Sequence, residues 1–217
     1  MAGALAARLG VPASKPVQVR LLLPPPLERP LSVRYADGVL ALVDPRTDQP
    51  VAEARLSPTT LTPPPGVPLN VALDAAAGYP GHRHHPFPTC FSCGPGRDDG
   101  LRIFPGPVSG SSPTPLVAAP WVPEEADVAT TWAALDCVGG WAGDLEERPM
   151  VLGSITAHVL ATPELGQAHV VVGQSRGSEG RKTFTASALY SGDGRLVGAA
   201  EHVWIAVDPA VFNTLQQ

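Results

Sequence analysis

The chain has 217 residues, a formal net charge of −5 and a pI near 5.6. This acidic balance excludes the basic surface that nucleic-acid binding requires, and no basic amphipathic segment or apolar run of about 20 residues indicates a membrane. The N-terminal stretch MAGALAARLG lacks the features of a signal peptide. We therefore expect a cytoplasmic protein that binds neither nucleic acid nor a membrane.

The chain contains 26 prolines and 22 glycines, which shorten helices and favour short strands bounded by turns. A Gly/Ala-rich helical piece is expected at 2–10. Short alternating or β-branched runs then predict strands at 17–23, 31–35, 38–43 and 50–56.

Proline and glycine clusters dominate the middle of the chain. Residues 58–89 contain LTPPPGVP and AAGYPGHRHHPFP, which are typical of a linker. We expect this linker to have little regular structure and to separate a first unit, 1–57, from a second, 90–217.

The second unit is also rich in predicted strands. Strands are expected at 100–104, 115–122, 153–161, 168–174, 182–190 and 196–207. One helix is expected at 127–145, because acids precede it and apolar residues follow at helical spacing. A single helix among antiparallel strands predicts a sheet wrapped around a buried helix.

The two units resemble each other in sequence. When 19–33 is placed on 157–171, Pro25 falls on Pro163 and Leu27 on Leu165. In both units an extended segment, a polar turn and a closing strand follow, and a Gly/Ala-rich helical piece precedes. The pattern predicts an internal duplication with an incomplete first copy.

The predicted helix carries an unusual stretch, TWAALDCVGGWAG, from Thr131 to Gly143. Gly costs about 1 kcal/mol against Ala inside a helix, and an unpaired buried carboxylate costs more. Asp136 is therefore a candidate functional residue, although the residues alone favour a structural acid, hydrogen-bonded to a neighbouring strand or across a dimer interface. Its neighbour Cys137 is expected to be a small core residue.

Several motifs together resemble one family. CFSCGPGRDDGLRIF, a helix ending AALD, the stretch TPELGQ and GRKTFTASALYSGDGRLVGAA occur in the order seen in hotdog-fold acyl-CoA thioesterases of the phenylacetate-pathway type. The resemblance covers Cys90 to Val207. It implies an α+β hotdog fold, an antiparallel sheet around a central helix, and the duplication then implies a double hotdog.

The resemblance also implies a catalytic site. In the family a helical acid acts on the thioester as general base or nucleophile, and Asp136 occupies its place. Ser154 falls near a position whose hydroxyl holds the attacking water. The His-Gly-Gly that opens the family's helix would fall at 127–129 and is absent. Backbone N–H groups at the helix N-terminus are still expected to stabilise the oxyanion.

The resemblance further implies an acyl-CoA thioester as the substrate, with coenzyme A only as part of it and no separate cofactor. Arg176, Arg181 and Lys182 are expected to contact its phosphates, and Trp132 and Trp141 to line its pocket. The sequence fits equally well with these three cations lying on an ordinary solvent-exposed hairpin. A homodimer is expected.

The Cys90-x2-Cys93 pair, with His82, His84 and His85 upstream, raises the question of zinc. No second pair stands at the spacing of a zinc finger, so we expect a glycine-ended turn and no metal. His158 and His202 are expected to be hydrogen-bonded sheet residues.

Three functions remain open from the sequence. Thioester hydrolysis is the leading one, and a non-catalytic acyl-CoA or acyl-carrier binding protein is the alternative. The absent His-Gly-Gly and the lack of an acid in the first copy favour binding, whereas Asp136 and Ser154 favour hydrolysis. Hydratase chemistry ranks last, because the Asp-x4-His arrangement of hydratase relatives is not evident.

Overall fold

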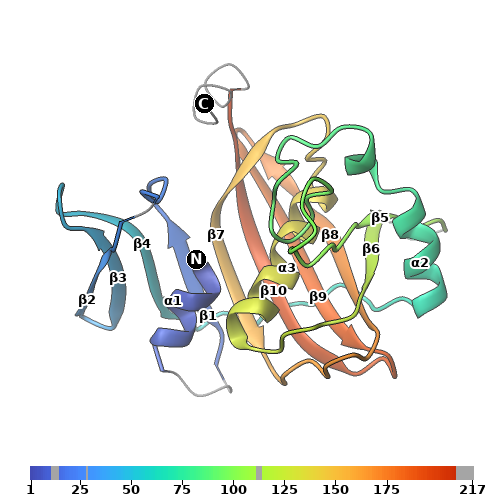
Figure 1. Cartoon of the computed structure of the whole chain (residues 1–217), viewed down its shortest axis with the longest axis horizontal. Coiled ribbons are helices and arrows are strands. Elements are labelled where there is room, and N and C mark those ends of the chain that lie inside the picture. Colours follow the sequence, from blue (N-terminus) through green and yellow to red (C-terminus); the bar gives the residue numbers. More distant parts are fainter. Residues whose placement is uncertain (11–14, 28, 111–113, 209–217) are drawn as a thin grey trace.

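The computed structural model of the chain describes residues 1–10, 15–27, 29–110 and 114–208. Its strands form one antiparallel sheet with the order β2-β3-β4-β1-β7-β10-β9-β8-β6-β5 (Figure 1). The strands are β1 (Val17–Leu21), β2 (Ser32–Ala36), β3 (Val39–Asp44), β4 (Gln49–Leu56), β5 (Gly106–Pro107), β6 (Leu116–Trp121), β7 (Met150–Val159), β8 (His169–Glu179), β9 (Lys182–Ser191) and β10 (Leu196–Ala206). The helices are α1 (Ala2–Arg8), α2 (Leu69–Ala77), the short 3-10 turn η1 (Pro80–His82) and α3 (Val128–Ala142).

The larger part of the sheet curves around α3, as the sequence predicts. This helix packs on β7, β8, β9 and β10 (Figure 1). Asp127 caps it, because its side chain accepts a hydrogen bond from the Thr130 amide at 2.6 Å. Leu135 and Val138 are buried against the sheet, so α3 forms the centre of the main apolar core.

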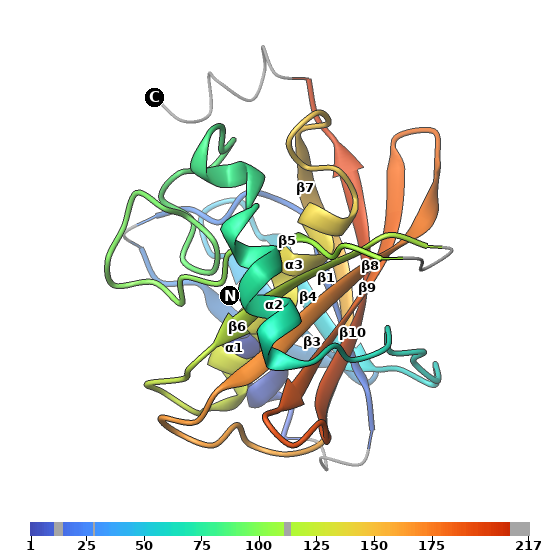
Figure 2. The same cartoon turned by 90° about the vertical axis from the view of Figure 1, so that its right-hand side faces the viewer.

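The consecutive valines of β8 are covered by a helix on each face of the sheet. Val171 belongs to the core under α3, whereas Val170 and Val172 pack with Ala72 and Ala75 of α2. Neighbouring strand residues point to opposite faces, so a continuous apolar run fits a strand with a helix on each side. Figure 2 shows α2 lying across the sheet beside β6.

The predicted duplication matches the topology. After α1 the strands are ordered β1-β4-β3-β2, and after α3 they are ordered β7-β10-β9-β8. The offset that places Pro25 on Pro163 places β1 on the second half of β7 and β2 on β8. The equivalent strands β1 and β7 pair directly, with Val19 opposite Ile155, so one sheet runs through both halves.

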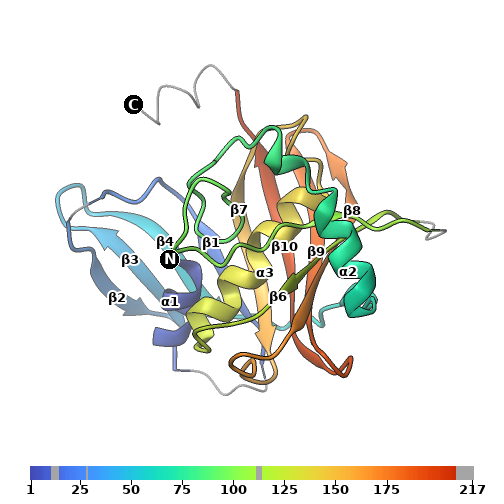
Figure 3. The same cartoon turned by 45° about the vertical axis from the view of Figure 1, so that its right-hand side comes forward.

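The two predicted halves also meet through their helices. α1 lies against α3, as Figure 3 shows. A Cβ on Gly3 would stand 2.7 Å from Ala129 Cα and from Trp132 Cβ. Glycine is therefore required where the two helices cross.

Two expectations about the middle of the chain need correction. Residues 58–89 were expected to have little regular structure, yet they contain α2 and η1, and α2 is held by its buried alanines. Residues 100–104 were expected to form a strand. Arg102 instead has a left-handed φ of 54°, and the Leu101 and Ile103 amides donate to the carbonyls of Phe91 and Ser92. This segment pairs with the cysteine loop rather than with the sheet.

No helix among the described residues has both the length and the apolar character that a bilayer crossing needs.

Candidate active site around Asp136

Asp136 lies in the middle of α3, one helical turn after Trp132, which lines an apolar cavity. The residues Val128 and Trp132 precede it at intervals of four, and both line a cavity of about 340 Å³ between α1, α3 and β7. Positions four apart share one face of a helix, so Asp136 continues this stripe. The side chain is half-buried, and its Oδ1 is fully buried with no hydrogen-bond partner among the described residues.

The surroundings change the acidity of this carboxyl. Burial, which removes water from the charged form, raises the pKa of Asp136 to about 7. A negative charge at Cys90 raises this pKa further, whereas the ammonium group of Met1 opposes the shift. A carboxyl of this kind can exchange a proton near neutral pH.

Three side chains hold the turn of α3 that carries Asp136. The Ser92 hydroxyl donates to the Ala133 carbonyl at 2.6 Å. The Ser187 hydroxyl and the His202 Nε2 both donate to the Leu135 carbonyl, at 2.7 and 3.1 Å. Donors from a loop and from two strands thus fix the carbonyls just before Asp136.

His202 is the buried end of a longer chain of hydrogen bonds. Its Nδ1 lies 3.2 Å from the Thr185 hydroxyl, and that hydroxyl accepts from Trp204 Nε1 at 3.0 Å. Burial lowers the pKa of His202 to about 4, so the ring is neutral at pH 7. The expectation that His202 is a hydrogen-bonded sheet residue is confirmed.

The glycines beside Asp136 allow α3 to lie close to the sheet. A Cβ on Gly139 would stand 2.7 Å from His202 Nδ1 and 2.8 Å from Thr185 Oγ1. On Gly140 it would stand 3.2 Å from the Trp204 ring, and on Gly143 3.0 Å from Thr183 Cγ2. The helix therefore gives up propensity at Gly139 and Gly140 for close packing.

The structure does not bring Ser154 to Asp136. Ile155 is paired with His202, whose ring reaches α3, whereas Ser154 is paired with Val203. Because side chains alternate along a strand, Ser154 points to the sheet face away from α3. There it lines a groove of about 470 Å³. The two residues expected to act together thus lie on opposite faces.

Of the expected phosphate-binding residues, Arg176 lies in the same groove as Ser154. Its guanidinium donates to the Thr62 carbonyl at 2.9 Å. Arg181 and Lys182 lie instead at the β8–β9 turn, where Arg181 donates to the Ala206 carbonyl. Arg148, from the loop after α3, donates to the Gly180 carbonyl at 2.6 Å. Three cations therefore gather beside the C-terminal end of α3.

The two tryptophans expected to line a pocket have different surroundings. Trp132 lines the apolar cavity near Asp136, in agreement with the expectation. Trp141 packs on the Tyr79 ring at 4.7 Å between centroids, and its Nε1 donates to Cys93 Sγ at 3.4 Å. Trp141 thus belongs to a second core and does not line that cavity.

The N-terminus of α3 is unsuited to the same thioester carbonyl as Asp136. Eight residues separate Val128 from Asp136, which corresponds to about 12 Å along a helix. Asp127 already occupies the Thr130 amide. An oxyanion near Asp136 would therefore need donors other than these amides, contrary to the expectation from the sequence.

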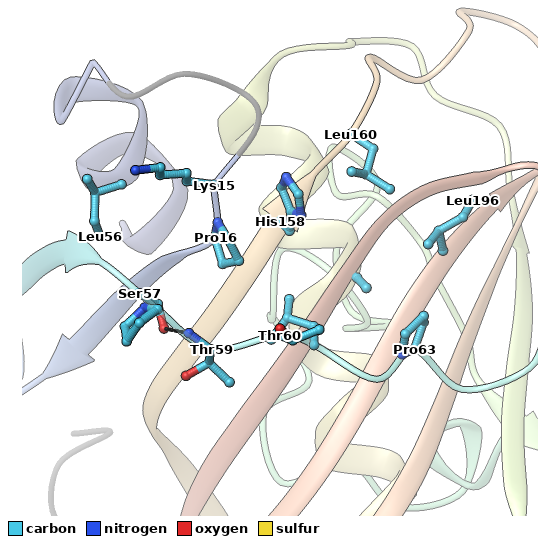
Figure 4. Close-up of a pocket in the computed structure, with 13 residues that line it drawn as sticks. Lys15, Pro16, Leu56, Ser57, Thr59, Thr60, Pro63, His158, Leu160 and Leu196 are labelled. Carbon is cyan, nitrogen blue, oxygen red and sulfur yellow. Dashed lines mark hydrogen bonds between the residues drawn. The ribbon is translucent and has the colours of Figure 1, made fainter.

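A larger cavity lies on the sheet face away from α3. It measures about 610 Å³ and is covered by the chain that follows β4. Figure 4 shows residues that line it: Lys15, Pro16, Leu56, Ser57, Thr59, Thr60, Pro63, His158, Leu160 and Leu196. Asp136 is not part of its lining, and His158 contributes to this cavity rather than to the site on α3.

The sequence did not predict which side chains lie beside Cys137. Its thiol lies 3.4 Å from Cys90 Sγ, and the sulfurs of Cys90, Cys93 and Cys137 all lie within 4.8 Å of one another. The available signal was a third cysteine on the only strongly predicted helix, but nothing in the spacing indicated that it meets the pair.

No protein-family model matches the sequence, and no curated protein is significantly similar to it. Solved structures with similar folds include a hot dog fold protein of unknown function from Alicyclobacillus acidocaldarius, with a TM-score of 0.60 at 12% identity over 96% of this chain and 86% of that one. A TesB protein from Mycobacterium avium subspecies paratuberculosis matches with a TM-score of 0.57 at 12% identity over 95% and 84%. An acyl-CoA thioesterase II from Mycobacterium marinum matches with a TM-score of 0.52 at 10% identity over 91% and 81%.

These likenesses extend over most of each chain. Together with the sheet order and the central helix, they establish that this chain has the predicted α+β hotdog fold. At such low identity they establish the fold alone, so activity has to be argued from the residues.

Proposed function

We propose that the chain is a thioester hydrolase that acts on acyl-CoA, with Asp136 as its general base. Asp136 accepts a proton from water while the water oxygen attacks the thioester carbonyl. The carbon–sulfur bond then breaks, the thiolate of coenzyme A takes up a proton, and the acyl group leaves as a carboxylic acid. Several proteins of similar fold carry the name thioesterase, which supports this class of reaction.

One observation carries the proposal. The Oδ1 atom of Asp136 is buried and finds no partner in the part of the chain that the structure describes, although its helix is held by three well-made side-chain hydrogen bonds. An unpaired buried carboxylate oxygen destabilises the fold unless something else engages it. A substrate-bound water is the partner that the proposed reaction supplies.

The apolar cavity beside this acid fits the acyl group. Trp132, Val159 and Leu160 contribute apolar surface to its wall. Its volume of about 340 Å³ is at the lower end of the range for small-molecule sites. We propose that the acyl chain enters there and that the thioester lies one helical turn further along α3, at Asp136.

The cations at the β8–β9 turn fit the other end of the substrate. Arg181 and Lys182, together with Arg148, lie beside the C-terminal end of α3, away from the acyl cavity. Guanidinium and ammonium groups suit the phosphates of coenzyme A. We propose that they bind those phosphates, while Arg176 is bound to the chain after β4.

The test is a thiol-release screen over short, long, branched and aryl CoA thioesters, followed by the Asp136→Asn variant. This variant keeps the shape and removes the proton acceptor, so turnover should fall about 10²–10⁴-fold. The melting temperature should stay level or rise, because an unpaired acid is replaced by a neutral amide. Asp74→Asn, which removes the same charge from an exposed position on α2, should leave both quantities unchanged. Turnover of Asp136→Asn close to that of the original chain would refute the role of Asp136.

A binding protein without chemistry is the second candidate. It is favoured by one observation, namely that Ser154 lies on the other face of the sheet, so it cannot assist Asp136 within the chain. If the chain is such a binding protein, calorimetry should detect the binding of acyl-CoA, but none of the CoA thioesters in the screen should release thiol.

A further inference from the structure

Three cysteine sulfurs meet in one place from two separate parts of the chain. Cys90 and Cys93 lie in the loop after η1, and Cys137 lies on α3. All three Sγ atoms are within 4.8 Å of one another, and those of Cys90 and Cys137 are 3.4 Å apart. Three thiolates around one tetrahedral zinc ion, with bonds of about 2.3 Å, stand roughly 3.8 Å apart. The spacing of the sulfurs therefore fits a shared metal.

The loop around the first two cysteines has a tightly closed turn. The Gly94 amide donates to the Cys90 carbonyl at 2.9 Å, and a Cβ on Gly94 would stand 2.4 Å from the Cys90 amide nitrogen. The Cys93 and Ser92 amides approach the Cys90 sulfur as hydrogen-bond donors. Amides directed at a sulfur favour the thiolate, which is the form that binds metal.

Cys93 also receives N–H donors, although it is only 1% exposed. Trp141 Nε1 donates to its sulfur at 3.4 Å, and His85 Nε2 lies 3.4 Å from the same atom. The Phe87 amide donates to His85 Nδ1 at 2.9 Å, so the proton of the neutral ring is assigned to Nε2. His85 Nε2 also lies 3.2 Å from the Cys93 carbonyl, so His85 is an outer donor to Cys93, shared between its carbonyl and its sulfur, rather than a metal ligand.

This arrangement resembles the support that proteins give to metal-bound thiolates. Ligating groups are usually held by hydrogen bonds from a second layer of residues, and here His85, Trp141 and two backbone amides supply them. A disulfide explains less, because it would pair two of the sulfurs and leave the third, with its donors, without a role. A divalent cation removes the repulsion among three thiolates and uses all of them.

We propose that Cys90, Cys93 and Cys137 bind one zinc ion as thiolates, with the fourth coordination position held by water or an exogenous ligand. Zinc is preferred because thiolate ligands in a tetrahedral arrangement select it among divalent ions. Each thiol that binds releases its proton to solvent. The proposal reverses the expectation of no metal that the sequence alone gave, and it does not depend on the proposed hydrolase activity.

Without a metal, the loop after η1 and the helix α3 are linked by side-chain contacts. Zinc would tie the loop after η1 to α3 at the residue next to Asp136. The Ser92 hydroxyl already connects this loop to the Ala133 carbonyl. Binding of a ligand to the folded form alone stabilises it, so zinc should raise the melting temperature.

The experiment uses the full chain, purified under reducing conditions with any affinity tag removed. Metal analysis should find one zinc per chain. Cobalt added to the metal-free protein should give intense visible bands and a near-ultraviolet thiolate-to-cobalt charge-transfer band that saturate at one equivalent. Cys137→Ser should lower zinc affinity by at least about tenfold, and His85→Gln about 10–100-fold. His84→Asn, an exposed neighbour in the same loop, is the matched control and should bind zinc normally.

The measurements on the unaltered chain test the proposal even where a cysteine variant fails to fold. Absence of both zinc and the cobalt bands in the reduced, folded protein would overturn the proposal. A Cys90–Cys137 disulfide in protein isolated from cells and analysed without added oxidant would also overturn it. So would full zinc affinity in both Cys93→Ser and Cys137→Ser, because the metal would then lie elsewhere.

Discussion

Asp136 and Cys137 show how two adjacent residues on one helix take on different chemistry. Asp136 continues the stripe of Val128 and Trp132 toward the apolar cavity, whereas Cys137 meets the sulfurs of the loop after η1. Consecutive helical residues point about 100° apart, so a single turn can supply two sites. The residue pattern singled out Asp136 as an acid within an apolar helix, and its catalytic role remains a prediction, whereas nothing in the sequence indicated that Cys137 meets Cys90 and Cys93.

At the β8–β9 turn we predict an effect on substrate recognition alone. The double variant Arg181→Ala/Lys182→Ala should raise KM for an acyl-CoA substrate about tenfold or more, because it removes two charges that we propose bind the phosphates of coenzyme A. KM for the same acyl group on pantetheine, which lacks the nucleotide phosphates, should not change. Steady-state kinetics with the two substrates make the comparison. An equal rise in both KM values would contradict phosphate binding at this turn.

A second prediction at the residue scale concerns His202 and pH. Its pKa is about 4 in the folded chain and about 6.5 in the unfolded chain, so the unfolded state binds more protons between these values. The free energy of unfolding is therefore highest above pH 6.5 and falls as the pH drops toward 4, by about 3 kcal/mol in total.

Urea denaturation at a series of pH values measures this loss. The His202→Gln variant should be less stable at pH 7, because the ring packing and its hydrogen bonds are lost. Its stability should, however, fall less steeply between pH 6.5 and 4.5 than that of the original chain. Equal slopes for the two proteins would show that His202 is not the titrating group.

At the scale of single elements, α3 combines local helix signals with glycines that its tertiary contacts require. Gly139 and Gly140 lower its intrinsic propensity, yet a Cβ at these two positions would collide with His202 and crowd Trp204. The sequence predicted this helix from its acids and apolar spacing, because those signals are local. It did not explain the glycines, because they are needed for close packing against a sheet whose strands come much later in the chain.

We predict that Gly139→Ala destabilises the protein although alanine is the better helix former. The new methyl would stand 2.7 Å from the hydrogen-bonded His202 ring, so the helix or the ring must move. Overpacking of this kind costs about 1–3 kcal/mol, against about 1 kcal/mol gained in propensity. Thermal and urea unfolding measure the difference.

A double-mutant cycle provides the control. Thr185 Oγ1 would lie 2.8 Å from the same methyl, so Thr185→Ala should remove part of the clash. Gly139→Ala should therefore cost less in the Thr185→Ala background than alone. Strictly additive effects would mean that the methyl does not meet this side chain.

At the scale of the whole molecule, the two predicted units share one sheet. The division into 1–57, 58–89 and 90–217 remains a prediction, since the sheet continues from β1 to β7 without a break. Val19 is fully buried and lies between Ala54 and Ile155 in this joint. The expected homodimer also remains a prediction.

We predict a single cooperative unfolding transition for the whole chain. All four tryptophans, Trp121, Trp132, Trp141 and Trp204, lie after residue 90, so their fluorescence reports the second unit, whereas circular dichroism reports both. The two signals should give the same midpoint. Val19→Ala should lower both midpoints equally, whereas Val33→Ala, on the exposed β2, should have little effect. An earlier transition seen only by circular dichroism would show that the units unfold separately.

The sequence by itself determined the local and repeated features of this protein. Strand runs, the helix with acids at its start and the matched Pro25 and Pro163 depend on residues close together in the chain, and these predicted the strands, the central helix and the duplication. The hotdog fold was predicted from the family resemblance, and the catalytic role of Asp136 remains a prediction. Sequence patterns failed where contacts are distant. The face on which Ser154 lies depends on strand register, and the meeting of Cys137 with Cys90 and Cys93 depends on how a loop folds over α3. Only the tertiary structure decides such contacts, because packing rather than local propensity brings distant side chains together.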